Sequence, residues 1–424
     1  MDVAVVRADF PLLHEPVRGR PLIYLDNAAT TQRPRQVLET MHTFYTRYNA
    51  NIHRSPHYLG QIATDLYDQA HANVARFVGA RSKREIVFTR NATEALNLVA
   101  VALLRRESGP LQLRPGDEVV VTVLEHHSNL VSWQTLCAEA GLTLRVAGIH
   151  NDGTLDMEQL AALLGARTRL VCCTYVSNVL GVINPVDEIG RLTRAAGALF
   201  LIDGAQAVPH MPVDVTALGC DFLVFSGHKM LAPFGSGVLY GREELLAQMA
   251  PFLLGGGMIE RVTLEGATWN APPWKFEAGT PDVAAAIALG GARDWARDIC
   301  LTGAVDYLDT IGLDVIHAHT LALTRQLLVG LAAIPGIRVY GPPADAPRGP
   351  IVSFGVGDAD PHWIAQLLND QGIAVRAGGH CAYPLAQALG VSGTVRVSPY
   401  LYNTEAEITR FLTVLEEIVR HRLL

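Results

Sequence analysis

Short apolar runs that end in a polar residue or a glycine alternate with helix-like segments along the first two thirds of the chain. Four such runs are 118–122, 170–175, 199–203 and 222–226, and a helical pattern at 189–196 lies between two of them. Strands that are apolar along their whole length are typical of parallel sheets, whose two faces are both covered by helices. The alternation therefore predicts an α/β fold with a mostly parallel sheet.

The pattern changes after about residue 300, where longer helical segments and fewer strands predict a smaller α+β domain. We expect a large domain at 21–297 and a small domain at 298–424, with 1–20 packing on the small one. A glycine-rich stretch at 254–258 is expected to leave the large domain as an excursion. The expected elements of the small domain are a long helix at 304–330, strands near 349–354, 373–376 and 394–398, a helix at 363–369 and a last helix from Glu405.

Charge and hydropathy exclude several classes of function. Lysine and arginine number 34 and aspartate and glutamate 41, so the formal net charge is −7, spread without a basic patch suited to nucleic acid. Apolar runs such as 98–104 are too short to cross a bilayer. The start of the chain, 1–10, lacks a secretory pattern. The sequence predicts a cytoplasmic protein with no nucleic-acid or membrane partner.

Cysteine usage singles out one thiol. No Cys-x-x-Cys spacing occurs, and the His317-x-His319 pair has no further ligand nearby, so no metal site is predicted. Five of the six cysteines are expected to be buried as small apolar residues. Cys381 instead follows Gly378-Gly379-His380 in a predicted turn, where a thiol is accessible and can be nucleophilic. The five expected to be buried are Cys137, Cys172, Cys173, Cys220 and Cys300.

An amine, an acid and a thiol together indicate pyridoxal 5'-phosphate (PLP) chemistry on a sulfur-containing amino acid. Lys229 follows the run 222–226, and Asp203 ends the run before it. A lysine can carry the cofactor as a Schiff base, and an acid beside the pyridinium nitrogen keeps the ring an electron sink. Alternatively, Lys229 is a surface residue and Asp203 only caps a helix.

Ordered motifs over nearly the whole chain carry a family resemblance. The sequence resembles the SufS-type cysteine desulfurases and selenocysteine lyases, in the class V aminotransferase group of fold-type I PLP enzymes. The resemblance implies a seven-stranded sheet in the large domain. The motifs are Tyr24–Thr31, Tyr48–Arg54, Glu125–Asn129, Asp203–Gln206, Ser226–Lys229, Trp274–Thr280, Arg376–Cys381 and Tyr400–Asn403.

The resemblance assigns roles around the cofactor. It places Asp203 against the pyridinium nitrogen, Gln206 at the ring hydroxyl and His126 stacked on the ring, where a histidine titrating near neutrality could move protons. A helix that opens at 91–94 offers amide groups to the phosphate. The expected phosphate contacts are Ala92, Thr93, Ser226 and His228, with Gly279 and Thr280 reaching in from the neighbouring subunit of a homodimer.

Other residues are predicted to bind the substrate. Arg396 lies in an apolar strand pattern, where an unpaired guanidinium would be costly, and the substrate carboxylate could be its partner. The alternative is an internal salt bridge. Asn178 and Arg376 are expected to help position the substrate or a loop. His53 and Arg54 are expected to line the pocket from the N-terminal side.

The resemblance implies a reaction in which L-cysteine becomes L-alanine and its sulfur is held as a persulfide on Cys381. Either Lys229 or His126 would take the Cα proton. The sulfur would pass to an acceptor protein, for iron–sulfur cluster assembly. Alternatives are a selenocysteine lyase, and a PLP-dependent β-lyase, epimerase or transaminase, none of which needs the thiol. A catalytically silent protein on the same scaffold is disfavoured because Lys229, Asp203 and Arg396 are all present.

Two segments depart from the family pattern. Gly379 stands where the family has the first of two histidines, and 230–235 reads Met-Leu-Ala-Pro-Phe-Gly where the family has Tyr-Gly-Pro-Thr-Gly. Adjacent glycines remove Cβ restrictions on the backbone. The pair 378–379 therefore predicts a mobile loop that a docked acceptor would order.

Overall fold

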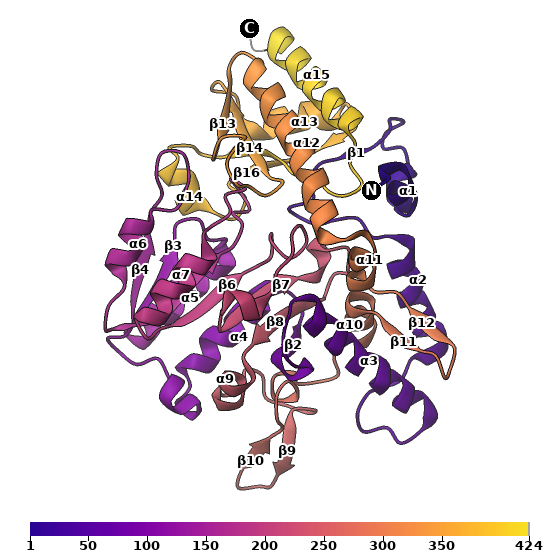
Figure 1. Ribbon diagram of the computed structural model, residues 1–424, viewed down its shortest axis with the longest axis vertical. Helices are drawn as coiled ribbons and strands as arrows, with labels where there is room; N and C mark the ends of the chain where they lie inside the picture. Colours follow the sequence, from indigo (N-terminus) through magenta and orange to yellow (C-terminus); the bar gives the residue numbers. More distant parts are fainter. Residues whose placement is uncertain (423–424) are drawn as a thin grey trace.

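The computed structural model describes residues 1–422, and its centre is a seven-stranded sheet in the order β2-β8-β7-β6-β5-β3-β4 (Figure 1). Every neighbouring pair is parallel except those of β8, which is antiparallel to both β7 and β2. The predicted α/β fold is confirmed. The strands are β2 (Ile86–Thr89), β3 (Glu118–Thr122), β4 (Thr143–Ala147), β5 (Thr168–Thr174), β6 (Leu199–Asp203), β7 (Phe222–Ser226) and β8 (Gly237–Gly241).

Both faces of this sheet are buried, which explains the continuous apolar runs. In β5, Leu170 and Cys172 pack into one apolar cluster, while Val171 and Cys173 pack into another on the opposite face. Alternate side chains of a strand point to opposite faces, so a strand covered on both sides is apolar at every position. The helices of this part are α3 (Tyr58–Phe77), α4 (Ala92–Leu104), α5 (Val131–Ala140), α6 (Met157–Leu163), α7 (Val186–Ala195), α8 (Val215–Leu218), α9 (Glu243–Gln248) and α10 (Val283–Gly290).

A second, antiparallel sheet of four strands, in the order β13-β14-β17-β16, forms the smaller α+β unit at the top of Figure 1. Its apolar core is separate from those of the large sheet. The sequence pattern missed β13. The strands are β13 (Ile337–Tyr340), β14 (Val352–Val356), β16 (Arg376–Gly378) and β17 (Thr394–Val397), and the helices are α12 (Leu313–Ala333), α13 (Pro361–Asn369), α14 (Tyr383–Ala388) and α15 (Glu405–Arg422).

Two expectations were wrong. The helix expected at 304–330 is two helices, α11 (Ala304–Ile311) and α12, because Gly312 has φ +90°, a left-handed conformation that ends the first helix. Cys300 is exposed rather than buried, since its strand β12 (Ile299–Leu301) pairs only with β11 (Ala292–Asp294) in a two-stranded hairpin. Of the other four cysteines expected to be buried, all are buried.

The N-terminal segment contacts both units. Arg7 of α1 (Val3–Ala8) pairs with Glu407 of α15 at 3.0 Å. The ring of Phe10 packs against those of Tyr307 and Tyr402. Short strand β1 (Ile23–Tyr24) then runs parallel to β15 (Ile373–Ala374), and α2 (Arg35–Thr43) leads into α3. The N-terminal segment therefore packs against the small unit before the chain enters the large sheet.

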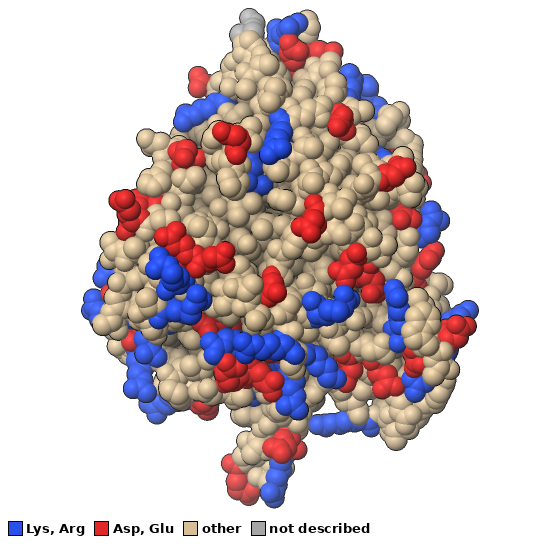
Figure 2. Space-filling model, in the orientation of Figure 1, with Lys and Arg blue, Asp and Glu red and all other residues tan. Residues whose placement is uncertain are grey.

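The expected excursion is a hairpin of β9 (Ile259–Val262) and β10 (Ala267–Trp269), which projects from the lower end of the molecule (Figure 1). Acidic and basic side chains are interspersed over the face shown in Figure 2, and both signs occur on this hairpin. Within residues 1–422, the helices are all too short or too polar to cross a membrane.

Candidate active site

The carboxyl ends of the central strands converge on a cavity of about 330 Å³. Asp203 ends β6 and Ser226 ends β7, while Lys229 follows in a 3-10 turn at 227–229. Twelve of the predicted site residues line this cavity. They are Lys229, Cys381, His126, Asp203, Gln206, Ala92, Thr93, Ser226, His228, Arg396, Asn178 and Arg376.

The environment of Lys229 favours a reactive amine. Desolvation lowers the pKa of its ammonium group to about 8, although the Asp203 carboxylate opposes the shift. Burial in turn raises the pKa of Asp203, while the N–H of Ala205, at 3.0 Å, and the charge of Lys229 favour its ionised form. The site therefore holds an amine that loses its proton easily beside an acid that benefits from a cationic neighbour.

His126 is held as a neutral ring. Its Nδ1 accepts the backbone N–H of Ser128 at 3.2 Å and lies 2.7 Å from the Ser128 hydroxyl, which leaves the proton on Nε2. Burial, followed by the charge of Lys229, lowers the pKa of His126 to about 3. The expected titration near neutrality is therefore wrong for this arrangement. A neutral, fixed ring suits stacking better than proton transfer.

The start of α4 forms a cradle of donors next to Ser226. Asn91 caps the helix by accepting the N–H of Glu94 at 2.9 Å, and the Ala92 N–H donates to Ser226 Oγ at 2.9 Å. Gly237 lets β8 pass against this cap, because a Cβ there would lie 2.4 Å from the Asn91 Cα. The cradle thus joins a helix N-terminus to a strand end, an arrangement suited to phosphate.

The polar groups of the cavity fit PLP. Gln206 donates through Nε2 to the Ala28 carbonyl at 2.7 Å. Among the described residues, Gln206 Oε1 and His228 Nδ1 are buried and have no hydrogen-bond partner. Buried polar atoms are normally paired, so both are available to a bound polar group. Together with Lys229 and Asp203, they provide a lysine, an acid and phosphate donors in one cavity.

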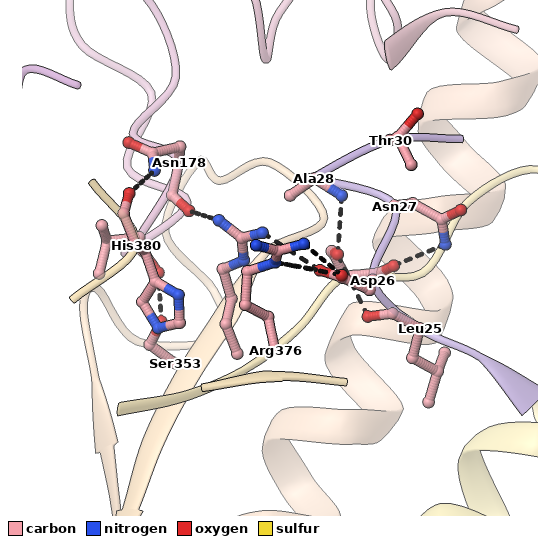
Figure 3. Close-up of polar contacts among 12 residues, drawn as sticks. Leu25, Asp26, Asn27, Ala28, Thr30, Asn178, Ser353, Arg376 and His380 are labelled. Carbon is pink, nitrogen blue, oxygen red and sulfur yellow. Dashed lines mark hydrogen bonds and ion pairs between the residues drawn. The ribbon is translucent and has the colours of Figure 1, made fainter. Parts of the chain in front are cut away.

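The arginines predicted to bind substrate converge on Asp26 (Figure 3). Arg396 Nη2 lies 3.3 Å from Asp26 Oδ1, and its Nη1 donates to the Asn178 carbonyl at 2.9 Å. Arg376 pairs with the same carboxylate at 3.0 Å. The internal salt bridge that was the alternative for Arg396 is therefore present. Arg396 Nε is buried and, within residues 1–422, has no partner.

The loop that carries Cys381 is tethered on both sides of the thiol. The Cys381 carbonyl accepts the His127 N–H at 2.7 Å, and the Tyr383 N–H donates to His127 Nε2 at 3.0 Å. The His380 carbonyl accepts from Asn178 Nδ2 at 2.8 Å (Figure 3). Cys381 itself is exposed and lines the cavity. The thiol is thus accessible while its backbone is held.

Backbone conformation adds to this constraint. His380 and Cys381 have φ +51° and +56°, which non-glycine residues seldom adopt and which surrounding contacts must stabilise. A Cβ at Gly379 would lie 2.5 Å from the ring of Tyr383. The structure therefore gives Gly379 a packing reason besides the mobility expected from the glycine pair. In the segment 230–235, which departs from the family pattern, the ring of Phe234 stacks on that of His228, with centroids 5.6 Å apart.

Four predicted residues lie around a separate cavity of about 510 Å³ and do not line the one that contains Lys229. Glu277 anchors their neighbourhood by accepting from Tyr67 Oη at 2.8 Å and from the Phe88 N–H at 2.7 Å. The ring of Trp274 packs on that of His53 at 4.4 Å. The four residues are His53, Arg54, Gly279 and Thr280.

Sequence reasoning gave no role to three residues that shape the site. Asp26 lies in the motif Tyr24–Thr31, and the need of a buried arginine for a partner was the signal that could have found it. His127 lies in the motif Glu125–Asn129, where no local signal distinguishes it from an ordinary polar residue. Glu125 is fully buried and accepts from Thr122, Asn129 and the Thr174 N–H at 2.6, 2.6 and 2.9 Å, which ties the turn before His126 to β5. In the described part of the chain, three or more metal-ligating side chains do not gather anywhere.

Comparison with known proteins agrees with this geometry. The model of the Aminotransferase class-V family matches residues 23–411. The chain belongs to that family. Members of the aminotransferase class-V family use PLP, so the cofactor prediction is confirmed along with the predicted resemblance.

Two relatives and one solved structure match this chain over nearly their whole length. The chain is 48% identical to a probable cysteine desulfurase of Halobacterium salinarum, over 98% of this chain and 96% of the relative. It is 47% identical to a cysteine desulfurase of Dickeya dadantii, over 99% and 97%. The apo structure of a cysteine desulfurase from Thermococcus onnurineus NA1 matches with a TM-score of 0.89 at 40% identity, covering 98% of both chains.

Proposed function

We propose that this protein is a PLP-dependent cysteine desulfurase that converts L-cysteine to L-alanine and holds the sulfur as a persulfide on Cys381. The observation that carries the proposal is the exposed Cys381 thiol, tethered at the same cavity as Lys229 and Asp203. Other reactions of PLP enzymes on amino acids need the lysine and the acid but not a thiol nucleophile. The cytoplasmic location predicted from the sequence is kept as part of this proposal.

The protein groups around the cofactor have separate tasks in this proposal. Lys229 binds PLP covalently, Asp203 lies at the ring nitrogen and Gln206 at the ring hydroxyl, with the neutral His126 ring against the face. The phosphate is held by the start of α4 and by β7. When bound, PLP withdraws electrons from the substrate Cα. The phosphate contacts are Ala92, Thr93, Ser226 and His228.

Substrate binding and proton transfer fall to other side chains. Arg396 binds the substrate carboxylate through its unpaired Nε edge, and Asn178 and Arg376 keep it in place. The amine of Lys229, when it is free, would take the proton from the substrate Cα. Its lowered pKa suits this step, because a general base works best when its pKa lies near the operating pH.

The sulfur step needs Cys381 as a thiolate. Its sulfur attacks the substrate sulfur, a new S–S bond forms and the Cβ–S bond breaks. The electron pair of the broken bond stays with the substrate Cβ, which takes up a proton from solvent, Lys229 returns the proton to Cα, and the amino acid leaves as L-alanine. Because Cys381 faces the solvent, the persulfide can then pass to an acceptor protein, which we propose serves iron–sulfur cluster assembly.

We also propose a homodimer with shared active sites. The cavity around His53, Arg54, Gly279 and Thr280 lies apart from Lys229 of the same chain. These residues would act on the site of a second copy, with Gly279 and Thr280 reaching its phosphate. A dimer that needs both copies is expected to regain activity when a Lys229 variant and a Thr280 variant are mixed, since one intact site then forms.

The test of the function is product analysis with purified holoenzyme. With L-cysteine and a thiol reductant we expect equal amounts of L-alanine and sulfide, and a persulfide on Cys381 by mass spectrometry when the reductant is left out. Formation of pyruvate and ammonia would indicate a β-lyase instead, and D-cysteine an epimerase. L-selenocysteine as a parallel substrate tests the lyase alternative, because turnover confined to it would contradict the proposal.

A further inference from the structure

A short segment, 278–281, carries the two residues proposed to reach the phosphate of a second copy, Gly279 and Thr280. Both residues are exposed. Glu277 precedes the segment and Asp282 follows it, and the Asp282 side chain caps α10 by accepting a backbone N–H of that helix at 2.9 Å. With its far end fixed in this way, the direction in which the segment projects depends on how firmly Glu277 is held.

The Glu277 carboxylate is buried and accepts three hydrogen bonds. Its side chain is 4% exposed. Oε1 accepts the Phe88 N–H at 2.7 Å and lies 2.9 Å from His71 Nε2, while Oε2 accepts from Tyr67 Oη at 2.8 Å. A ring nitrogen that faces a carboxylate carries a proton, so Nε2 of His71 donates. A buried carboxylate is costly unless it is hydrogen-bonded, and these three donors remove that cost.

The three donors belong to two elements, β2 and α3. β2 is at the edge of the central sheet, next to β8, so its outer N–H groups face away from the ladder, and Phe88 donates one of them to Glu277. Tyr67 and His71 are one turn apart on α3 and present the same face, with the His71 side chain fully buried. The start of the segment is therefore tied to a strand and a helix that contact each other.

These residues lie away from the cofactor site of their own chain. Glu277 and Thr280 line two cavities, of about 460 and 510 Å³, and neither residue lines the cavity that contains Lys229. Glu277 therefore has no direct contact through which it could act on the cofactor of its own chain. An effect on the cofactor of a second copy has a direct path, through the adjoining residues 279 and 280.

We propose that Glu277 is a positioning residue for the active site of the second copy in the homodimer. By fixing the start of 278–281, it places Gly279 and Thr280 at the phosphate of the cofactor bound there. A short segment anchored at both ends has few conformations to lose on binding, so loss of one anchor weakens the contact. The proposal rests on the shared active sites proposed above.

The test measures how fast PLP leaves the holoenzyme during dialysis, from the amount that borohydride still fixes to Lys229 after each interval. We expect Glu277→Ala to release PLP about 10-fold faster than wild type, because the segment loses its anchor and a phosphate contact weakens. Glu277→Gln can still accept from Phe88 and His71 and can donate to the Tyr67 hydroxyl oxygen. It should therefore stay within about 3-fold of wild type.

Glu85→Ala is the matched control for the loss of a buried carboxylate. Glu85 is also buried, and it directly precedes β2, the strand to which Glu277 is bonded. It accepts the Arg81 N–H at 2.8 Å and has no contact with the segment 278–281. We expect Glu85→Ala to leave the rate of PLP release unchanged.

Heterodimers purified with two different affinity tags show which copy Glu277 serves. In a heterodimer of a Glu277→Ala chain and a Lys229→Ala chain, the remaining Lys229 belongs to the chain that lacks Glu277, but its site is completed by a segment whose Glu277 is intact. We expect its PLP to leave at the wild-type rate. Placing both substitutions in one chain, opposite a wild-type chain, reverses the arrangement and should give the fast release of the Glu277→Ala homodimer.

Equal rates in the two heterodimers, or faster release in the first, would overturn the proposal, as would Glu277→Gln releasing PLP as fast as Glu277→Ala. If Glu277→Ala does not fold, Tyr67→Phe takes its place in both heterodimers, because it removes a single hydrogen bond to Glu277. We then expect about 3-fold faster release in the second heterodimer alone, and unchanged release there contradicts the proposal. Failure of the shared sites themselves would appear separately, as no regain of activity when the Lys229 and Thr280 variants are mixed.

Discussion

The active-site cavity has two sides that are built in different ways. On one side, Asp203, Ser226 and Lys229 are set by the ladder of parallel strands, whose ends fix their positions. On the other, Arg396 and Cys381 come from the small unit and reach the cavity only through tethers. These tethers are the Asp26 carboxylate, the Asn178 amide and carbonyl, and the His127 N–H and ring.

The difference separates cofactor chemistry from sulfur chemistry. Groups on the strand ends depend on backbone pairing that no single side chain controls, so they suit a permanently bound cofactor. Groups held by side-chain tethers can be altered one at a time without loss of the sheet. Removal of Lys229 or Asp203 on the first side should therefore abolish all chemistry, whereas changes on the second should affect individual steps.

The largest effect is expected for Lys229→Ala, on the strand side. Loss of the covalent cofactor link and of the general base should lower L-alanine formation by about 10⁴-fold. Borohydride reduction of the wild-type holoenzyme followed by peptide mapping should label Lys229. A label on Lys275, which is buried, would contradict the assignment.

Cys381→Ala, on the tethered side, should leave cofactor binding and the absorbance change on adding L-cysteine intact. Sulfide release should fall by at least about 10³-fold because the nucleophile is gone. Cys300→Ala is the matched control, since Cys300 is the other exposed cysteine and lies outside the cavity. Wild-type turnover in Cys381→Ala would make the thiol structural and favour a β-lyase.

Substitutions of His127 test the tether between its ring and the Tyr383 N–H. His127→Phe keeps an aromatic ring beside Tyr383 but removes the acceptor for its N–H, so persulfide formation in a single turnover should slow by about 3- to 10-fold. His127→Gln can restore an acceptor and should recover most of the loss. Equal rates in both variants and wild type would show that the tether does not position Cys381.

The same tether predicts a pH dependence. Burial lowers the pKa of His127, so its neutral form, which accepts from Tyr383, is stabilised in the folded state. The contribution is present above the ordinary histidine pKa and is lost as pH falls through the lowered value. The rate at which iodoacetamide alkylates Cys381, corrected for the fraction of thiolate, should therefore change at acid pH in wild type. The same rate should not change in His127→Gln.

The smallest effect is expected for Phe234→Thr, on the strand side. This variant replaces Phe234 with the threonine that the family pattern has at that position. Phe234 stacks on His228, and the Arg33 guanidinium lies 4.5 Å from its ring centroid. Loss of these contacts should weaken PLP binding by about 3-fold, measured by cofactor release during dialysis. Val329→Thr, at an equally exposed position on α12, should have no effect.

The strand side of the site can be predicted from local sequence patterns. A strand buried on both faces must be apolar throughout, so the polar residues that end such runs, Asp203 and Ser226, mark the edge where ligands bind in a parallel sheet. Cys381 was expected to be accessible because it lies in a glycine turn and not in an apolar strand. Local patterns could not locate the exposure of Cys300, since it depends on what packs nearby.

How the two sides meet depends on the folded chain. Asp26 and Arg396 are 370 residues apart, and no local pattern relates them, but the strand pairing of β1 and the bridge to Ser398 place their charges in contact. The neutral state of His126 likewise follows from burial and from the nearby Lys229 charge. The physical reason is that charge balance and desolvation depend on distances in space, which the folded chain sets and the order of residues does not.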